Sequence, residues 1–111
     1  MKKHERVKSN IIFNEIINKG KKVGNQYFTI FFIGKNEERP QFGIAVPKRL
    51  GNAVVRNRLK RQTRELLDKT KLLFKNQRNY IIIVKEKCLR ESFVDKLEAL
   101  QQLIGDINEK K

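Results

Sequence analysis

The chain has few of the side chains that enzymes commonly use for chemistry. Among its 111 residues there are one histidine, His4, one cysteine, Cys88, and no tryptophan. A lone cysteine without a nearby histidine forms no internal disulfide, no zinc site and no Cys–His catalytic pair. No carboxylate cluster has a metal-ligand pattern, and Gly20 and Gly24 lack the context of a phosphate-binding loop. The sequence therefore offers no catalytic residue and no metal ligand.

Long apolar runs are also missing. No segment is long and apolar enough to cross a bilayer. The basic start of the chain is followed by an apolar stretch that Asn10, Asn14 and Glu15 interrupt, which argues against a signal peptide. Together with the single cysteine, this pattern predicts a protein of the reducing cytoplasm with no membrane partner.

Acidic residues are scarce relative to basic ones. The 26 lysines and arginines exceed the 12 acidic residues, which gives a net charge of +14 and a pI of about 10.2. This excess predicts strong attraction to a polyanion. No acid occurs between Arg39 and Arg64, and the densest part of this stretch holds seven cations: Lys48, Arg49, Arg56, Arg58, Lys60, Arg61 and Arg64.

A helix is predicted to carry most of these cations. Gly51-Asn52 is typical of a turn with Asn52 as the N-cap, so the helix should begin near Ala53 and continue to about Lys69. On a helical wheel, one arc of about 140° collects Arg56, Lys60, Arg64, Asn57 and Arg61. The opposite side holds Val55, Leu59 and Leu66. Arg58 lies beyond the basic arc and borders this apolar face.

The basic arc contains a ladder of like charges. Arg56, Lys60 and Arg64 follow one another at i,i+4 spacing, which costs an isolated helix a few tenths of a kcal/mol per pair. Ordinary solvated helices mix signs at this spacing, so a merely solvated face is the less favoured alternative. A polyanion would reverse the cost, and the ladder therefore predicts nucleic-acid binding.

The patterns of apolar residues in the rest of the chain predict an α+β fold in one domain, residues 1–111. Residues 1–8 form a basic arm that is expected to be flexible in the free protein. A first helix is expected with Ser9 or Asn10 as its N-cap and Gly20 at its end, and a last helix should open at Ser92. Residues 20–24 are expected to form a loop or a short strand. Strands are expected at 27–33, 42–46 and 80–84, the last of them an inner strand. The order helix, strands, helix, strand, helix indicates a small sandwich of about four strands with helices packed against the sheet.

One face of the predicted sheet is suited to a partner. Alternation places Phe31 beside Thr29, on the side where Gly43 and Ala45 leave a low surface. An aromatic side chain near a basic groove is how single-stranded nucleic acid is bound with little sequence preference. Phe13 lies in the first helix, and composition alone favours a core contact for it.

The basic stretch resembles a known signature. Its residues 51–61, Gly-Asn-Ala-Val-Val-Arg-Asn-Arg-Leu-Lys-Arg, continued to Arg64-Glu65, are similar to the signature of the bacterial ribonuclease P protein subunit, whose Arg-Asn-Arg motif falls at 56–58. The resemblance covers nearly the whole chain. It implies a fold similar to the second domain of ribosomal protein S5, with a left-handed βαβ crossover. It also implies a partner, the catalytic RNA of ribonuclease P, which cleaves the 5′ leader from precursor tRNA with the cofactor Mg²⁺.

The resemblance also assigns residues to two RNA surfaces. Those expected at the catalytic RNA are Lys48, Arg49, Arg56, Asn57, Arg58, Lys60, Arg61 and Arg64. Those expected in a cleft for the 5′ leader, between the first helix and the sheet, are Phe13, Ile17 and Phe31. Some members of the family have a further aromatic at the position of Ile17, and isoleucine cannot stack on a base in the same way.

Other functions explain parts of the pattern. A structural RNA-binding protein of ribosomal type accounts equally well for charge and fold, but it predicts no effect on precursor-tRNA cleavage. A DNA-binding regulator would need a turn and a second helix in front of the basic helix, and a strand is expected there instead. A self-sufficient nuclease is disfavoured by the missing catalytic groups.

Overall fold

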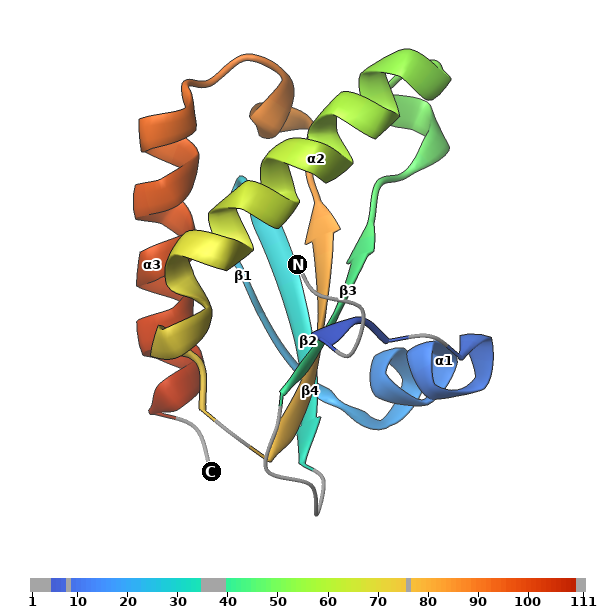
Figure 1. Cartoon of the computed structure of the whole chain (residues 1–111), viewed down its shortest axis with the longest axis vertical. Helices are drawn as coiled ribbons and strands as arrows, with labels where there is room; N and C mark the ends of the chain where they lie inside the picture. The colour runs from blue at the N-terminus through green and yellow to red at the C-terminus, as the bar shows by residue number, and fades with distance from the viewer. Residues whose placement is uncertain (1–4, 8, 35–39, 76, 110–111) are drawn as a thin grey trace.

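A mixed four-stranded sheet with helices on both faces forms the described part of the protein (Figure 1). The computed structural model describes residues 5–7, 9–34, 40–75 and 77–109. The predicted α+β class and element order are confirmed. The elements are α1 (Asn10–Lys19), β1 (Lys21–Gly24), β2 (Phe28–Gly34), β3 (Gln41–Ala45), α2 (Ala53–Thr70), β4 (Arg78–Val84) and α3 (Phe93–Asn108), with short 3-10 turns at Lys48–Leu50, Lys71–Leu73 and Glu86–Leu89.

The strands lie in the order β1-β2-β4-β3. β2 is antiparallel to β1 and β4, whereas β3 runs parallel to β4. β4 is thus an inner strand, as its continuous apolar sequence predicted, and four of its side chains, Tyr80, Ile81, Ile82 and Val84, are fully buried. Two predicted strands are shifted by one residue in the structure, and β1 forms in a segment that the sequence left open between loop and strand.

The parallel pair β3 and β4 is joined through α2. In Figure 1 both strands run upward, α2 descends in front of the sheet, and β4 lies to the left of β3. This path is a left-handed βαβ crossover, the uncommon hand for such a connection. The crossover brings the basic helix back across the sheet, where it lies close to β3.

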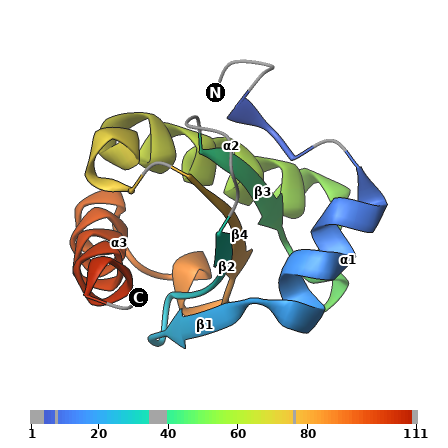
Figure 2. The same cartoon turned by 90° about the horizontal axis from the view of Figure 1, so that it is seen from below.

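The core lies between the sheet and the pair α2 and α3, while α1 covers part of the other face (Figure 2). An aromatic cluster closes one part of it, since the Phe42 and Tyr80 rings stack at 5.5 Å and Phe74 meets both rings edge-on. Each fully buried side chain of this size contributes roughly 1.5–3 kcal/mol. This core fixes β3 and α2, the elements that carry the candidate site.

The cap residues expected from the sequence begin all three helices. In α1, Ser9 Oγ accepts hydrogen bonds from the backbone N–H groups of Ile11 and Ile12, and in α3, Ser92 Oγ accepts one from Asp95. Gly20 ends α1 in an extended conformation with φ −77°. A Cβ there would lie 2.4 Å from Ile16 O and 2.7 Å from Phe32 O. Gly20 is therefore required by close backbone approach rather than by a left-handed turn.

Candidate nucleic-acid interface

The basic helix begins with a tight turn. Lys48–Leu50 forms a 3-10 turn, Gly51 has φ +150°, and Asn52 Oδ1 accepts a hydrogen bond of 3.0 Å from the N–H of Val55. A side chain at Gly51 would lie 3.0 Å from Val55 Cβ and would also have to adopt a φ that L residues rarely take. The predicted N-cap and helix start are confirmed, and the turn leaves Lys48 and Arg49 exposed beside the helix.

One side of α2 is buried as the wheel predicted. Leu59 and Leu66 are buried and Val55 packs against the core. Thr63 and Thr70 are buried as well, and each hydroxyl donates to the carbonyl one turn earlier, at 2.8 Å. These bonds satisfy the two hydroxyl groups inside the core. The buried face of α2 therefore includes Thr63 and Thr70 and is wider than the helical wheel indicated.

The like-charge ladder lies along one flank of α2. Arg56, Lys60 and Arg64 are half-buried, and Lys60 and Arg64 border a small cavity of about 170 Å³ next to Phe42, Gly43 and Ile44 of β3. Arg6 and Val7 line the same cavity. This flank therefore gathers cations from the N-terminal segment and from α2 at the edge of the sheet.

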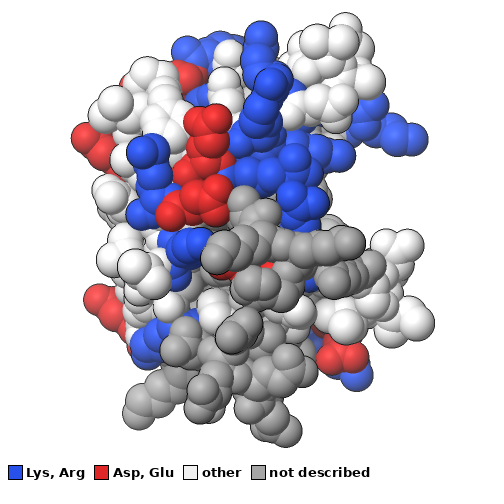
Figure 3. Space-filling model, in the orientation of Figure 1, with Lys and Arg blue, Asp and Glu red and all other residues white. Residues whose placement is uncertain are grey.

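The outer side of α2 is open to solvent. Asn57 and Arg61 are exposed there, one turn apart, and Figure 3 shows lysine and arginine side chains gathered over this part of the molecule. Arg58 is also exposed but lies on the opposite flank, toward α3. All eight residues assigned to the catalytic RNA thus belong to α2 or to the turn before it, and they surround its exposed side.

A buried lysine of α3, Lys96, lies near Arg58 of α2. Lys96 is only 5% exposed, and its Nζ donates a 2.8 Å hydrogen bond to Gln62 Oε1 of α2. Burial lowers the pKa of Lys96, the nearby Cys88 thiol opposes this shift, and the positive charge of Arg58 adds to it. The wheel left Arg58 between two faces, and the structure places it beside this second cation.

The Phe13 ring of α1 packs against the sheet. A Cβ added at Gly43 would lie 3.2 Å from Phe13 Cε2 and 2.6 Å from Ile81 Cδ1, so the Phe13 ring packs directly over Gly43. Phe13 is half-buried, which leaves part of its ring available to a partner. The space that the sequence predicted above Gly43 is present, and the Phe13 ring of α1 occupies it.

Phe31 lies in the same row of the sheet. The pairing register aligns Lys22, Phe31, Ile81 and Gly43 across the four strands. Lys22 Nζ lies 6.0 Å from the centroid of the Phe31 ring, and Phe31 is half-buried like Phe13. Ile17 is half-buried one turn after Phe13 on α1. The three residues expected in the leader cleft thus lie on α1 and β2.

Comparison with known proteins shows the family to which the chain belongs. The family model described as Ribonuclease P matches residues 1–108. The chain belongs to the ribonuclease P protein family. It is 35% identical over 102 residues to the ribonuclease P protein component of Bacillus cereus strain AH187, an alignment that covers 90% of this chain and 88% of that relative.

Solved ribonuclease P proteins share the fold. A Staphylococcus aureus ribonuclease P protein, a mutant with defective mRNA degradation activity, superposes with a TM-score of 0.87 at 28% identity and covers 96% of this chain and 90% of its own. The Thermotoga maritima ribonuclease P protein gives a TM-score of 0.82 at 29% identity, with coverage of 90% and 94%. The chain is therefore a component of the ribonuclease P type, a subunit of an endoribonuclease complex involved in tRNA processing.

Two cations near the predicted site residues were not singled out from the sequence. Arg6 was assigned only to the basic arm, but it forms a parallel bridge with Phe42, and the N–H of Val7 donates to Phe42 O at 3.0 Å. The residues around Lys22 show no clear helical or strand periodicity of apolar side chains. The position of Lys22 over Phe31 depends on the register between β1 and β2, which no local signal reports. Residues 1–4 and 8 of the arm lie outside the described residues.

The remaining polar groups do not form a reactive site in the described residues. In the described ranges, no three His, Cys, Asp or Glu side chains come together as a metal site. The Cys88 thiol is buried and donates to Tyr27 O at 3.1 Å, and burial raises its pKa, which disfavours the reactive thiolate. Within those ranges, no helix is long and apolar enough to span a membrane.

Proposed function

We propose that this protein binds the catalytic RNA of ribonuclease P through α2 and the 5′ leader of precursor tRNA through the α1 cleft. It would thereby assist the Mg²⁺-dependent removal of the leader that yields mature tRNA 5′ ends. The protein contributes binding and position, while the RNA holds most of the magnesium and supplies the active site. The reducing cytoplasm is the proposed location, and neither DNA nor a membrane is a proposed partner.

One observation carries this proposal. Gly43 of β3 lies under the Phe13 ring, and it also lines the cavity that Lys60 and Arg64 border. The aromatic cleft and the like-charge ladder therefore meet at a single residue of one strand. A leader in the cleft and an RNA backbone along α2 would be neighbours, which suits a subunit that brings the substrate to a catalytic RNA.

The chemistry of each surface fits its proposed ligand. Arginine offers planar N–H donors that match phosphate oxygens, and five of the eight α2-side residues are arginines. Aromatic rings stack on bases of any sequence, and such a stack contributes roughly 1–3 kcal/mol. Phe13 and Phe31 provide this stacking without base-specific donors, so one cleft can accept the different leaders of many precursors.

Reconstitution tests the proposed function. The purified protein is combined with refolded ribonuclease P RNA and leader-bearing precursor tRNA at low magnesium, and cleavage is compared with that by the RNA alone. We expect faster cleavage at the normal 5′ site. Tight RNA binding without any stimulation would instead support a structural RNA-binding protein of ribosomal type.

A further inference from the structure

A second group of cations lies at the other end of the sheet from Lys48 and Arg49. Lys21, Lys75 and Arg78 line a cavity of about 460 Å³, and none of the described residues that line it is acidic. Arg78 begins β4, whereas Lys48 follows the end of the parallel strand β3. With strands of about six residues, the two groups are separated by roughly 20 Å along the sheet.

Arg78 is held in place by its neighbours. Its guanidinium lies 5.1 Å from the centroid of the Phe32 ring, its Nη1 donates to Ile107 O at 3.3 Å, and it hydrogen-bonds Tyr80. A side chain that is already ordered loses little conformational entropy when it binds a ligand. The cavity therefore has one fixed guanidinium in its wall, and this group suits the oxygens of a phosphate.

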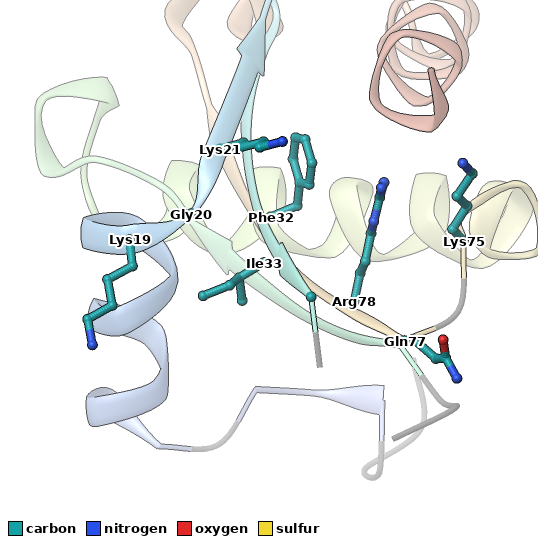
Figure 4. A pocket seen from close by; sticks show the side chains of 9 residues that line it. Lys19, Gly20, Lys21, Phe32, Ile33, Lys75, Gln77 and Arg78 are labelled. Carbon is teal, nitrogen blue, oxygen red and sulfur yellow. The ribbon is translucent and has the colours of Figure 1, made fainter. Parts of the chain in front are cut away.

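The flanking side chains face the same space. In Figure 4, Lys21 and Lys75 extend on the same side as Arg78, while Lys19 points away from them. Lys21 and Lys75 are exposed, so their ammonium groups can reach a ligand. Gln77, between Lys75 and Arg78, has φ +63°, a conformation that non-glycine residues seldom adopt and that is often found at functional sites.

We propose that this cavity binds a phosphate of an RNA strand and forms a further RNA contact, in addition to those proposed at α2 and α1. The inference rests on the proposed function, because it takes the partner to be RNA of the same complex. The charge distribution supports it: seven of the 26 cations belong to the α2 interface, and the other 19 still exceed the 12 acidic residues. The protein would then contact RNA at both ends of its sheet.

A charge-removal pair tests the site. Lys21→Gln with Lys75→Gln removes two cations at the cavity, and Lys87→Gln with Arg90→Gln removes two cations at the turn before α3, away from both α2 and the cavity, so both variants have the same net charge. We expect the cavity variant alone to weaken RNA binding, by roughly threefold to tenfold, with a log–log salt slope less steep by about 0.7–0.9. Equal affinities and slopes for the two variants would overturn the proposal.

A tethered cleavage reagent identifies which RNA supplies the phosphate. Cys88 is only 2% exposed, so a new thiol in Lys19→Cys, at the rim of the cavity, can be labelled selectively with an iron chelate. We expect strand cuts in either the catalytic RNA or the precursor that are absent with the same label in Gln101→Cys on α3. The same cuts from both positions, or none, would refute the site. Unmodified protein that fails to stimulate precursor cleavage would instead refute the proposed function.

Discussion

Gly43→Ala tests whether the Phe13 ring over β3 is part of the leader site. The added Cβ would lie 2.6 Å from Ile81 Cδ1 and 3.2 Å from Phe13 Cε2. Ile81 is fully buried and has little room to move, whereas Phe13 is half-buried and can shift outward. Overpacking of this kind costs about 1–3 kcal/mol, and we expect a value toward the upper end because the tighter contact is with the buried Ile81.

The displaced ring should bind the leader less well. Complete loss of one aromatic stack corresponds to roughly 5- to 150-fold in affinity, and a shifted ring should lose about fivefold. The assay compares the affinity of the reconstituted complex for leader-bearing and leaderless precursor, and urea unfolding of the protein measures its stability. We expect the preference for the leader to fall while the affinity for leaderless precursor stays the same.

Gly105→Ala provides the matched control. A Cβ at Gly105 meets nothing within 4 Å, and this residue lies in α3, away from the cleft. Alanine in a helix should stabilise the protein by about 0.5–1 kcal/mol and leave the leader preference unchanged. The reasoning is refuted if Gly43→Ala lowers the stability but preserves the preference for leader-bearing precursor.

Three further predictions concern single side chains. Phe13→Ala should weaken binding of leader-bearing precursor more than of mature tRNA, and equal losses in a binding titration would remove Phe13 from the leader site. Arg61→Ala should weaken binding to the catalytic RNA with an unchanged circular dichroism spectrum, because Arg61 is exposed; a lost helical signal would make the residue structural. Lys96 has a pKa below its usual value, so folding disfavours its charged form. The cost is present at neutral pH and disappears as the pH rises toward 10.5, so the stability of the wild type relative to Lys96→Met should increase over that range in urea unfolding. A difference that is constant with pH would contradict this.

Much of the secondary structure was predictable because its signals are local. Ser9, Asn52 and Ser92 cap their helices through hydrogen bonds to N–H groups two or three residues away, so the sequence alone marked these starts. The apolar and basic sides of α2 followed from helical geometry in the same way. Strand ends were less certain by one or two residues, since pairing with a neighbour decides where a strand stops.

The site was predictable in part. The cations of α2 stand out as a run without acids, and the family resemblance supplied the cleft residues. From composition alone Phe13 was assigned to the core, and the structure shows why that assignment was incomplete: its ring packs on Gly43 yet remains half-exposed. Arg6 and Lys22 had no sequence signal, because each acquires its place by pairing with a distant strand.

The sequence by itself determined a basic α+β domain, its helix caps and the two faces of α2, since all of these depend on residues close together in the chain. Only the tertiary structure decided that β3 and β4 are parallel neighbours and that α2 crosses between them with a left-handed path. It also decided that Gly43 lies under the Phe13 ring and lines the cavity that Lys60 borders. Such contacts join distant residues, so they depend on the path of the whole chain and on how its core packs.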